Sequence, residues 1–237
     1  MAPSSETRMS ISPDLTLAEL RIALAPAVAE AAVFDGWTAL AVTNAAATEG
    51  VDPEVAKFAF KAKGTSAAMT LIGAWIGSVD RAMETALPAE TLAGLKIRER
   101  IRRLVQFRLD ALAGQQEALR RALAIMAMPH NAAQALRLGW SSADAMWRLA
   151  GDTATDYNHY TKRMTLGALY ASTLAVFAHD ESEGFAETRA FLERRIDNVM
   201  QFEKIKAQLL RPDAESTEAA DHLLRQIPDQ RKVRARQ

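Results

Sequence analysis

Apolar side chains recur at intervals of three and four residues along nearly the whole chain. This spacing gives one broad apolar face to each of the segments 66–87, 95–112 and 131–150, as expected for helices packed against a core. Valine, isoleucine and threonine nowhere build the alternating pattern of a half-buried strand. The pattern therefore predicts an all-α protein.

The N-terminal part of the chain predicts three short helices separated by turns. Proline is well tolerated at the first position of a helix, so one helix is expected to begin at Pro26. Asp52 ahead of Pro53 has the character of an N-cap and should begin another. The expected segments are a short apolar stretch at 15–24 and helices at 26–34, 38–49 and 52–60. Such helices with a glycine-containing turn describe a helix-turn-helix unit.

Beyond Gly64 the predicted helices lengthen and should form a bundle. They are expected at 66–87, 95–112, 116–128 and 131–150, from Asp156 onward, and at 185–210. The predicted organisation is a disordered N-terminus (1–14), helix-turn-helix-like helices (15–64), a C-terminal lipid-binding bundle (65–212) and a flexible basic tail (213–237).

The N-terminal unit resembles the corresponding domain of the TetR class of regulators. The resemblance is carried by Gly36-Trp37-Thr38, the following helix, Gly50-Val51-Asp52, Phe60 and Lys63. It implies a TetR-like fold whose larger C-terminal bundle encloses an apolar pocket. Asp52 and Glu54 begin the third helix, where DNA phosphates must approach a recognition helix. We therefore expect a degenerate helix-turn-helix and no nucleic acid, with a ligand-responsive transcriptional regulator as the alternative.

Composition narrows the functional classes. The 237 residues are 49% hydrophobic, enough to bury a large core, and the formal net charge is zero, which excludes a global attraction to nucleic acid or anionic lipid. The absence of cysteine excludes disulfides, thiolate metal sites and a cysteine nucleophile. No apolar run reaches the roughly 18 residues of a membrane span, and the polar start lacks a secretory h-region. The sequence predicts a cytoplasmic protein with peripheral membrane contact.

The motifs of metal and nucleophilic catalysis are missing from the sequence. A di-iron bundle needs two Glu-x-x-His pairs, and no glutamate here precedes a histidine by three positions. Asp156 and His159 have that spacing once, while the remaining histidines, His130, His179 and His222, are scattered. There is no HExxH motif and no glycine-rich phosphate loop. We expect no catalytic residue, metal or cofactor; a metal-dependent enzyme is the less favoured alternative.

Basic residues gather in the predicted helix at 95–112 and in the tail. Those of the helix are Lys96, Arg98, Arg100, Arg102, Arg103 and Arg108, and those of the tail are Arg231, Lys232, Arg234 and Arg236. The helical block is interpreted as a solvated face with buried stems or as a surface for anionic membranes or acidic partners. At about 1 kcal/mol for each basic residue near an anionic surface, the tail assists membrane contact without securing it.

An unusual face is expected at the start of the helix after Gly151. Asp156, His159, Tyr160 and Arg163 are spaced at i, i+3, i+4 and i+7 and so share one side of a helix. An aromatic ring, an imidazole and two opposite charges are more typical of a contact patch than of a solvated face.

Nine methionines and four tryptophans are spread over helices that should converge. They fit an ordinary core or the lining of an adaptable cavity, because methionine conforms to irregular spaces. At about 0.8 kcal/mol for each buried CH₂, a five-carbon isoprene unit is worth roughly 3–4 kcal/mol. A cavity in this bundle could therefore extract a very insoluble lipid from a membrane.

A long gapped string of residues resembles the Coq-nine family, the lipid-binding accessory proteins of ubiquinone (coenzyme Q) biosynthesis. The string is Met128-Pro129-His130-Asn131, Met146-Trp147, Ala150-Gly151-Asp152, Thr155-Asp156, Asn158, Tyr160-Thr161, Arg163, Leu166, Tyr170, Thr173, Asp180, Ser182, Phe185, Thr188, Phe191-Leu192 and Arg195. The resemblance implies a homodimeric TetR-like protein that binds an isoprenoid or phospholipid. It also implies that quinone precursors are presented to the hydroxylase of demethoxyubiquinone and that the protein lies peripherally on the inner membrane.

The resemblance also assigns roles to residues. The hydroxylase-docking patch falls on Asp156, Tyr160 and Arg163, with His159 where animal members have tryptophan. The tail is shorter and less apolar than the membrane-binding helix that ends other members. No mitochondrial transit peptide is visible either, which suits a bacterial-type cytosolic member or a processed chain. The residues expected to line or gate the lipid pocket are Met146, Trp147, Leu166, Tyr170, Met126 and Trp75.

Overall fold

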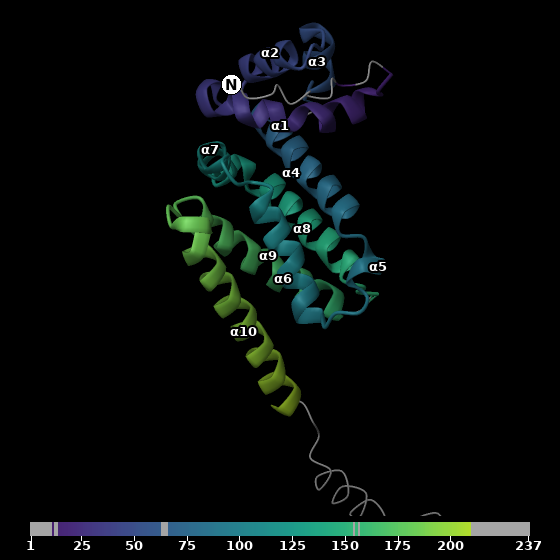
Figure 1. The fold of residues 1–237 in the computed structure, drawn as a ribbon, viewed down its shortest axis with the longest axis vertical. Helices are drawn as coiled ribbons and strands as arrows, with labels where there is room; N and C mark the ends of the chain where they lie inside the picture. Colours follow the sequence, from purple (N-terminus) through teal and green to yellow (C-terminus); the bar gives the residue numbers. More distant parts are fainter. Residues whose placement is uncertain (1–10, 12–13, 63–65, 154, 156, 210–237) are drawn as a thin grey trace, which may run out of the picture. The chain divides into compact units, whose positions relative to one another are not determined.

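The structure is a computed structural model that describes residues 11, 14–62, 66–153, 155 and 157–209. The chain divides into two compact units, Met1–Ile196 and Asp197–Gln237. Throughout the described residues the regular elements are helices, which confirms the all-α prediction (Figure 1). The predicted tail at 213–237 and the predicted boundary at residues 64 and 65 lie outside the described residues.

The helices follow one another through the chain with short connections. They are α1 (Leu17–Asp35), α2 (Ala39–Thr48), α3 (Pro53–Ala59), α4 (Ala67–Ala86), α5 (Ala89–Leu92), α6 (Ile97–Asp110), α7 (Gln116–Met126), the 3₁₀ turn η1 (Pro129–Asn131), α8 (Ala132–Leu149), α9 (Tyr157–Phe177), η2 (Glu183–Phe185) and α10 (Ala186–Leu209). The expected long helices are present within two residues of most predicted ends. The short helix α5 was not predicted.

Helix α1 corrects the prediction that a helix begins at Pro26. It starts nine residues earlier, at Leu17, after a capping box in which the backbone N–H of Glu19 donates to Thr16 Oγ1 and that of Thr16 donates to Glu19 Oε2. Proline removes one helical hydrogen bond, but Leu24 and Val28 on either side of Pro26 are fully buried. Burial of this face against α2, α3 and α4 keeps both halves in one helix.

The next two helices begin as the sequence predicts. Thr38 caps α2 by accepting a hydrogen bond from the backbone N–H of Leu40 (3.2 Å), and Asp52 caps α3 by accepting one from Glu54 (2.7 Å). Pro53 occupies the first turn of α3. Short polar side chains thus fix both helix starts by local hydrogen bonds alone.

Trp37 joins the N-terminal helices to the bundle. Its ring is buried 5.2 Å from that of Trp75 on α4, and its Nε1 donates to the backbone oxygen of Ala118 on α7 (3.2 Å). Helix α4 continues from this junction and packs against α6, α7 and α8, while α8 pairs with α9 (Figure 1). Five helices, α4 and α6 to α9, therefore surround the interior of the bundle.

Asp180 organises the turn that leads into α10. Its carboxylate accepts hydrogen bonds from the backbone N–H and the hydroxyl of Ser182 and of Thr188. Burial disfavours the ionised form, but these four donors outweigh burial and lower the pKa of Asp180 from 3.8 to about 2. Asp180, Ser182 and Thr188, which all belong to the string that resembles the Coq-nine family, are thus joined by hydrogen bonds at the start of α10.

We expect Asp180 to make stability depend on pH in the acid range. Because its folded pKa lies below its unfolded value, the stabilisation is complete above about pH 4 and is lost as the pH falls toward 2. Asp180→Asn should lower the free energy of unfolding at pH 7 by about 2 kcal/mol and flatten this dependence. Urea unfolding at several pH values measures both effects. Glu181→Gln, at an exposed neighbour, is the control, and parallel acid profiles of wild type and Asp180→Asn would contradict the assignment.

Candidate functional site

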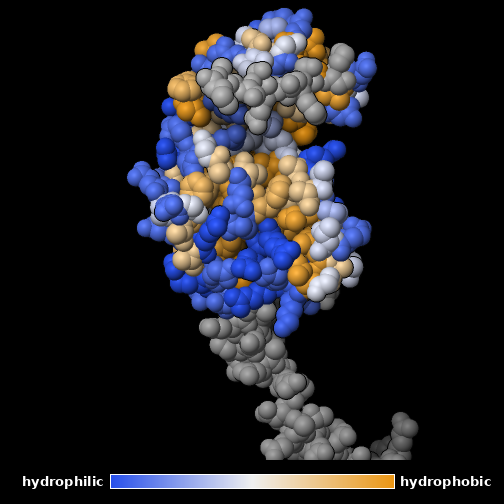
Figure 2. Space-filling model, viewed as in Figure 1, coloured by the Kyte–Doolittle hydropathy of each residue, from blue (hydrophilic) through white to orange (hydrophobic). Residues whose placement is uncertain are grey.

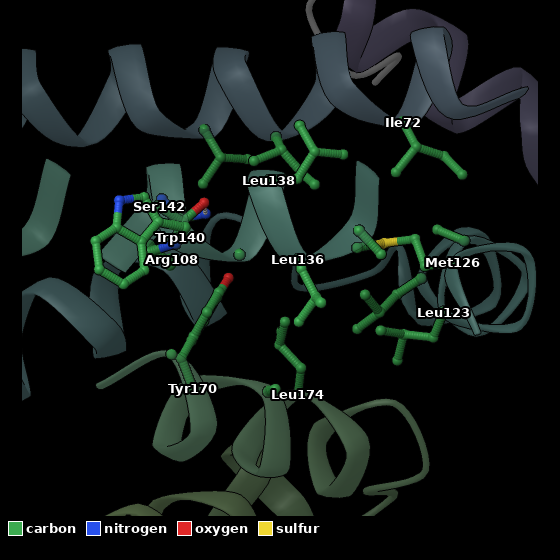
Figure 3. Close-up of a pocket in the computed structure, with 18 of the residues that line it drawn as sticks. Ile72, Arg108, Leu123, Met126, Leu136, Leu138, Trp140, Ser142, Tyr170 and Leu174 are labelled. Atoms are coloured by element: carbon green, nitrogen blue, oxygen red, sulfur yellow. Dashed lines mark hydrogen bonds between the residues drawn. The ribbon is translucent and has the colours of Figure 1, made fainter. Parts of the chain in front are cut away.

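A cavity of about 640 Å³ lies among α4, α6, α7, α8 and α9 (Figure 3). Most of its lining is aliphatic or aromatic. The lining residues are Ile72, Trp75, Ile76, Val79, Arg108, Leu112, Leu119, Ala122, Leu123, Met126, Ala127, Ala132, Ala135, Leu136, Leu138, Gly139, Trp140, Ser142, Arg163, Met164, Gly167, Ala168, Tyr170, Ala171 and Leu174. The apolar pocket predicted for the C-terminal bundle is therefore present.

Small residues at helical spacing account for the open space. On α8 Ala132, Ala135 and Gly139 face the cavity, and on α9 Gly167 and Ala171 do so. From α4 the large side chains Ile72, Trp75, Ile76 and Val79 line the same cavity. A close-packed core would need larger side chains at the alanine and glycine positions of α8 and α9.

The cavity opens to solvent between α8 and α9. Leu136 and Met164 both line it, and 76% and 66% of their surfaces are exposed. Single exposed apolar residues are ordinary on protein surfaces, but these two also line the cavity, one from α8 and one from α9. Figure 2 shows a broad apolar area across the helical bundle on the face in view.

One end of the cavity is polar. Arg108 is 1% exposed, forms an ion pair with Asp80 through Nη1, and donates from Nη2 to Ser142 Oγ (3.0 Å). Its guanidinium carbon lies 4.8 Å from the centre of the Tyr170 ring. Burial disfavours the charged form, but Tyr170 and Asp80 raise the pKa of Arg108 above its usual value, so it remains a cation. Figure 3 places Arg108, Ser142 and Tyr170 together, away from Leu123 and Met126.

Three of the six residues predicted to contact lipid line the cavity: Trp75, Met126 and Tyr170. The other three, Met146, Trp147 and Leu166, do not line this cavity. Met146 is fully buried in the core, and Leu166 lies with Leu169 and Thr173 on a neighbouring face of α9. Trp147 joins two helices instead, since its Nε1 donates to the backbone oxygen of Lys162 (2.9 Å).

The predicted docking face is only partly a surface. Tyr160 is 58% exposed, and its ring lies 5.2 Å from that of His159 and 5.9 Å from that of Trp140. Asp156 lies outside the described residues. The expectation that Arg163 shares this surface is wrong, because its side chain is 2% exposed and lines the cavity. The role of this patch in docking stays a prediction.

Arg163 is held by two carboxylates. Its Nε donates to Asp144 Oδ1 on α8 (2.6 Å), and its Nη1 donates to Asp152 Oδ2 in the turn before α9 (2.9 Å). The pKa of Arg163 is raised, because these hydrogen bonds outweigh the effect of burial. The two carboxylates hold the side chain of Arg163 in the interior at the start of α9, whereas the side chain of Tyr160 on the same helix is exposed.

Most of the basic block on α6 is engaged within the chain. Arg102 contacts Glu99 and Glu193, and Arg103 contacts Glu99. Arg100 donates to the backbone oxygens of residues 93, 95 and 150. These arginines are therefore paired within the chain while Arg98, Arg102 and Arg103 stay about half exposed, and Arg108 is buried.

The described residues contain no group of three acidic, histidine or cysteine side chains placed to hold a metal ion. Within the same part of the chain, no helix has both the length and the apolarity needed to cross a membrane.

Residues 132–203 match the COQ9 family model, and this segment contains α8 and α9. The human "Ubiquinone biosynthesis protein COQ9, mitochondrial" is 33% identical over 168 residues, covering 70% of this chain and 52% of the human protein. The Drosophila melanogaster protein of the same name is 27% identical over 177 residues, covering 73% and 53%. The chain thus spans about half the length of these curated relatives.

A solved structure shares the fold. The TetR transcriptional regulator from Nitrosomonas europaea ATCC 19718 superposes with a TM-score of 0.59 at 24% identity, covering 76% of this chain and 97% of that protein. This likeness confirms the predicted TetR-like fold.

Proposed function

We propose, from the premise that this chain is a COQ9 homologue, that it is a non-catalytic lipid-binding protein of ubiquinone biosynthesis. The predicted resemblance to the Coq-nine family is confirmed by the family model and by the curated relatives. In this proposal the cavity holds an isoprenoid quinone intermediate and presents it to the hydroxylase of demethoxyubiquinone. The observation that carries the proposal is the apolar cavity, two of whose walls, α8 and α9, lie in the matched segment.

The size and lining of the cavity favour a lipid. A volume of about 640 Å³ falls within the range of small-molecule sites, and such sites are mostly apolar with a few placed polar groups. Each five-carbon isoprene unit that enters gains roughly 3–4 kcal/mol from burial. This burial replaces the hydrocarbon surroundings that the lipid leaves in a bilayer, so extraction need not expose the tail to water. We therefore propose peripheral contact of the protein with the inner membrane.

The mouth of the cavity favours presentation to a partner. Trp140 lines the cavity and also lies 5.9 Å from the exposed ring of Tyr160 and 6.2 Å from His159. A protein that covers these rings would also reach Met164, which is exposed, lines the cavity and lies one helical turn from Tyr160 on α9. Docking and ligand release would then take place at one opening. The homodimer implied by the family is part of the same proposal.

DNA binding is not part of the proposal. The first turn of α3 carries Asp52, whose side chain caps the helix, and Glu54, which forms an ion pair with Lys57 (2.8 Å). Carboxylates at the start of a recognition helix repel phosphates, and this lysine is already paired.

The lipid extracted from the purified full chain tests the proposal. Mass spectrometry should identify isoprenoid quinone intermediates bound to the wild type and depleted from the Gly139→Phe variant. Equal amounts of lipid in both proteins would contradict the assignment of the cavity.

Tyr160→Ala should weaken binding to the demethoxyubiquinone hydroxylase at least tenfold without changing thermal stability. An exposed aromatic anchor contributes strongly to a contact but little to the fold. Biolayer interferometry with the purified hydroxylase and a melting curve measure the two effects. Phe34→Ala is the matched control, since Phe34 is 87% exposed on α1. Unchanged affinity of Tyr160→Ala would exclude this ring from docking.

A further inference from the structure

Arg108 has one donor that the protein does not use. Its Nε is buried and has no hydrogen-bond partner among the described residues, although Nη1 and Nη2 are engaged by Asp80 and Ser142. A buried donor left unsatisfied destabilises the folded state, so each such group in a native protein calls for a physical explanation. Arg108 is among the residues that line the cavity, and an oxygen of a bound molecule is the acceptor that would complete its hydrogen bonding.

The polar end carries little net charge. The carboxylate of Asp80 balances the guanidinium of Arg108, and those of Asp144 and Asp152 surround Arg163, the other cation of the lining. A ligand carboxylate or phosphate would bring an uncompensated charge into a buried site, which is costly. An uncharged oxygen needs only the one free donor.

The surroundings of Arg108 suit a flat ring. Tyr170 lies against the guanidinium, and Trp140 lines the same end of the cavity (Figure 3). Aromatic walls stack on planar groups, whereas the opposite end, at Leu123 and Met126, offers only aliphatic and thioether contacts. The two ends therefore differ in the chemistry that they accept.

We infer that the polar end is a head-group site that binds an uncharged, oxygen-bearing ring through Arg108 Nε, with the apolar tail directed toward Leu123 and Met126. Ketone, phenol and methoxy oxygens are acceptors of this class. Arg108 is then a specificity residue that sets the direction of the bound lipid. The inference rests on the proposed function, because it presupposes an apolar ligand in this cavity.

Displacement of Nile red from the delipidated full chain tests the inference. Three probes share a ten-carbon alkyl tail: a dimethoxy-methyl-benzoquinone, a benzene without oxygens and the carboxylate decanoate. We expect the quinone to displace the dye at a concentration about tenfold lower than the alkylbenzene requires, because one buried hydrogen bond contributes about that factor to affinity. Decanoate should be the weakest of the three probes.

Two variants remove the donor in different ways. Arg108→Met/Asp80→Leu replaces the buried ion pair by apolar groups, an exchange that is often neutral for stability. Arg108→Lys keeps the charge beside Asp80 but lacks the Nε–H. Arg108→Met/Asp80→Leu should abolish the tenfold advantage of the quinone and leave displacement by the alkylbenzene unchanged. Arg108→Lys keeps ammonium donors and should reduce the advantage without abolishing it. Lys57→Met/Glu54→Leu removes an exposed ion pair on α3 and should behave as the wild type.

The outcomes separate the two proposals. Equal displacement by quinone and alkylbenzene in the wild type, tighter binding of decanoate, or an advantage retained in Arg108→Met/Asp80→Leu would overturn the head-group site alone. Failure of all three probes to displace the dye from the wild type would overturn the proposed lipid-binding function as well.

Discussion

Replacing Gly139 with phenylalanine should lower the affinity for a long isoprenoid about a hundredfold and leave the fold intact. Gly139 lines the cavity from α8, and a Cβ added there would meet no heavy atom within 4 Å. The ring would occupy about the space of one isoprene unit, whose burial is worth roughly 3–4 kcal/mol, or more than two powers of ten in affinity. Stability should not fall, because glycine is a poor residue in a helix interior.

The measurement combines lipid extraction with dye displacement by an isoprenoid alcohol. Ser141→Phe is the matched control, since Ser141 lies exposed on the same helix two positions along and does not line the cavity. Its lipid content and affinity should equal those of the wild type. Undiminished lipid in Gly139→Phe would mean that the ligand binds elsewhere.

Arg163→Ala should lower the free energy of unfolding by about 3 kcal/mol. Removing one partner of a buried ion pair leaves a carboxylate without its counter-charge, and the side chain of Asp152 is only 4% exposed. Lys162 also contacts Asp152, and Arg148 contacts Asp144, so we expect the lower end of the range for buried pairs. The start of α9 should loosen first.

Chemical denaturation of Arg163→Ala and of Arg163→Ala/Asp152→Asn measures this effect. The second variant should recover part of the loss, because it removes the buried charge of Asp152, which Lys162 alone would then have to balance. Arg148→Ala is the control, as its side chain is 65% exposed and exposed pairs contribute little. A melting temperature unchanged by Arg163→Ala would show that the pair does not hold α9.

This prediction changes how the docking patch is tested. Reversing the charge of Arg163 would disturb the fold, so a loss of quinone synthesis in such a variant would not identify a docking residue. Tyr160 is the cleaner probe, because its ring is exposed. The family resemblance pointed to both residues, and only burial separates a positioning residue from a surface contact.

The sequence determined the elements of this protein. Helix starts at Thr38 and Asp52 were readable because capping is a local interaction between neighbouring residues. The long amphipathic helices were readable from their spacing, and the family from a string of matched residues. Pro26 misled the prediction because its local preference is overridden by the packing of α1 on three other helices.

The tertiary structure decided which faces meet the cavity. Met146 and Met126 look alike in the sequence, yet only Met126 lines the space, since the rotation of each helix about its axis is set by packing between helices. In the sequence Arg108 belongs to the basic block, and it was not predicted to line the cavity. Its spacing from Ile101, Leu104 and Val105 nevertheless puts it on their buried face. The partners of Arg108 are Asp80 and Ser142, which are distant from it in the chain. Only the tertiary structure therefore shows that Arg108 is paired and which of its nitrogens has no partner among the described residues. Periodicity fixes the side of a helix that turns inward, but only the assembled bundle fixes what lies across from it.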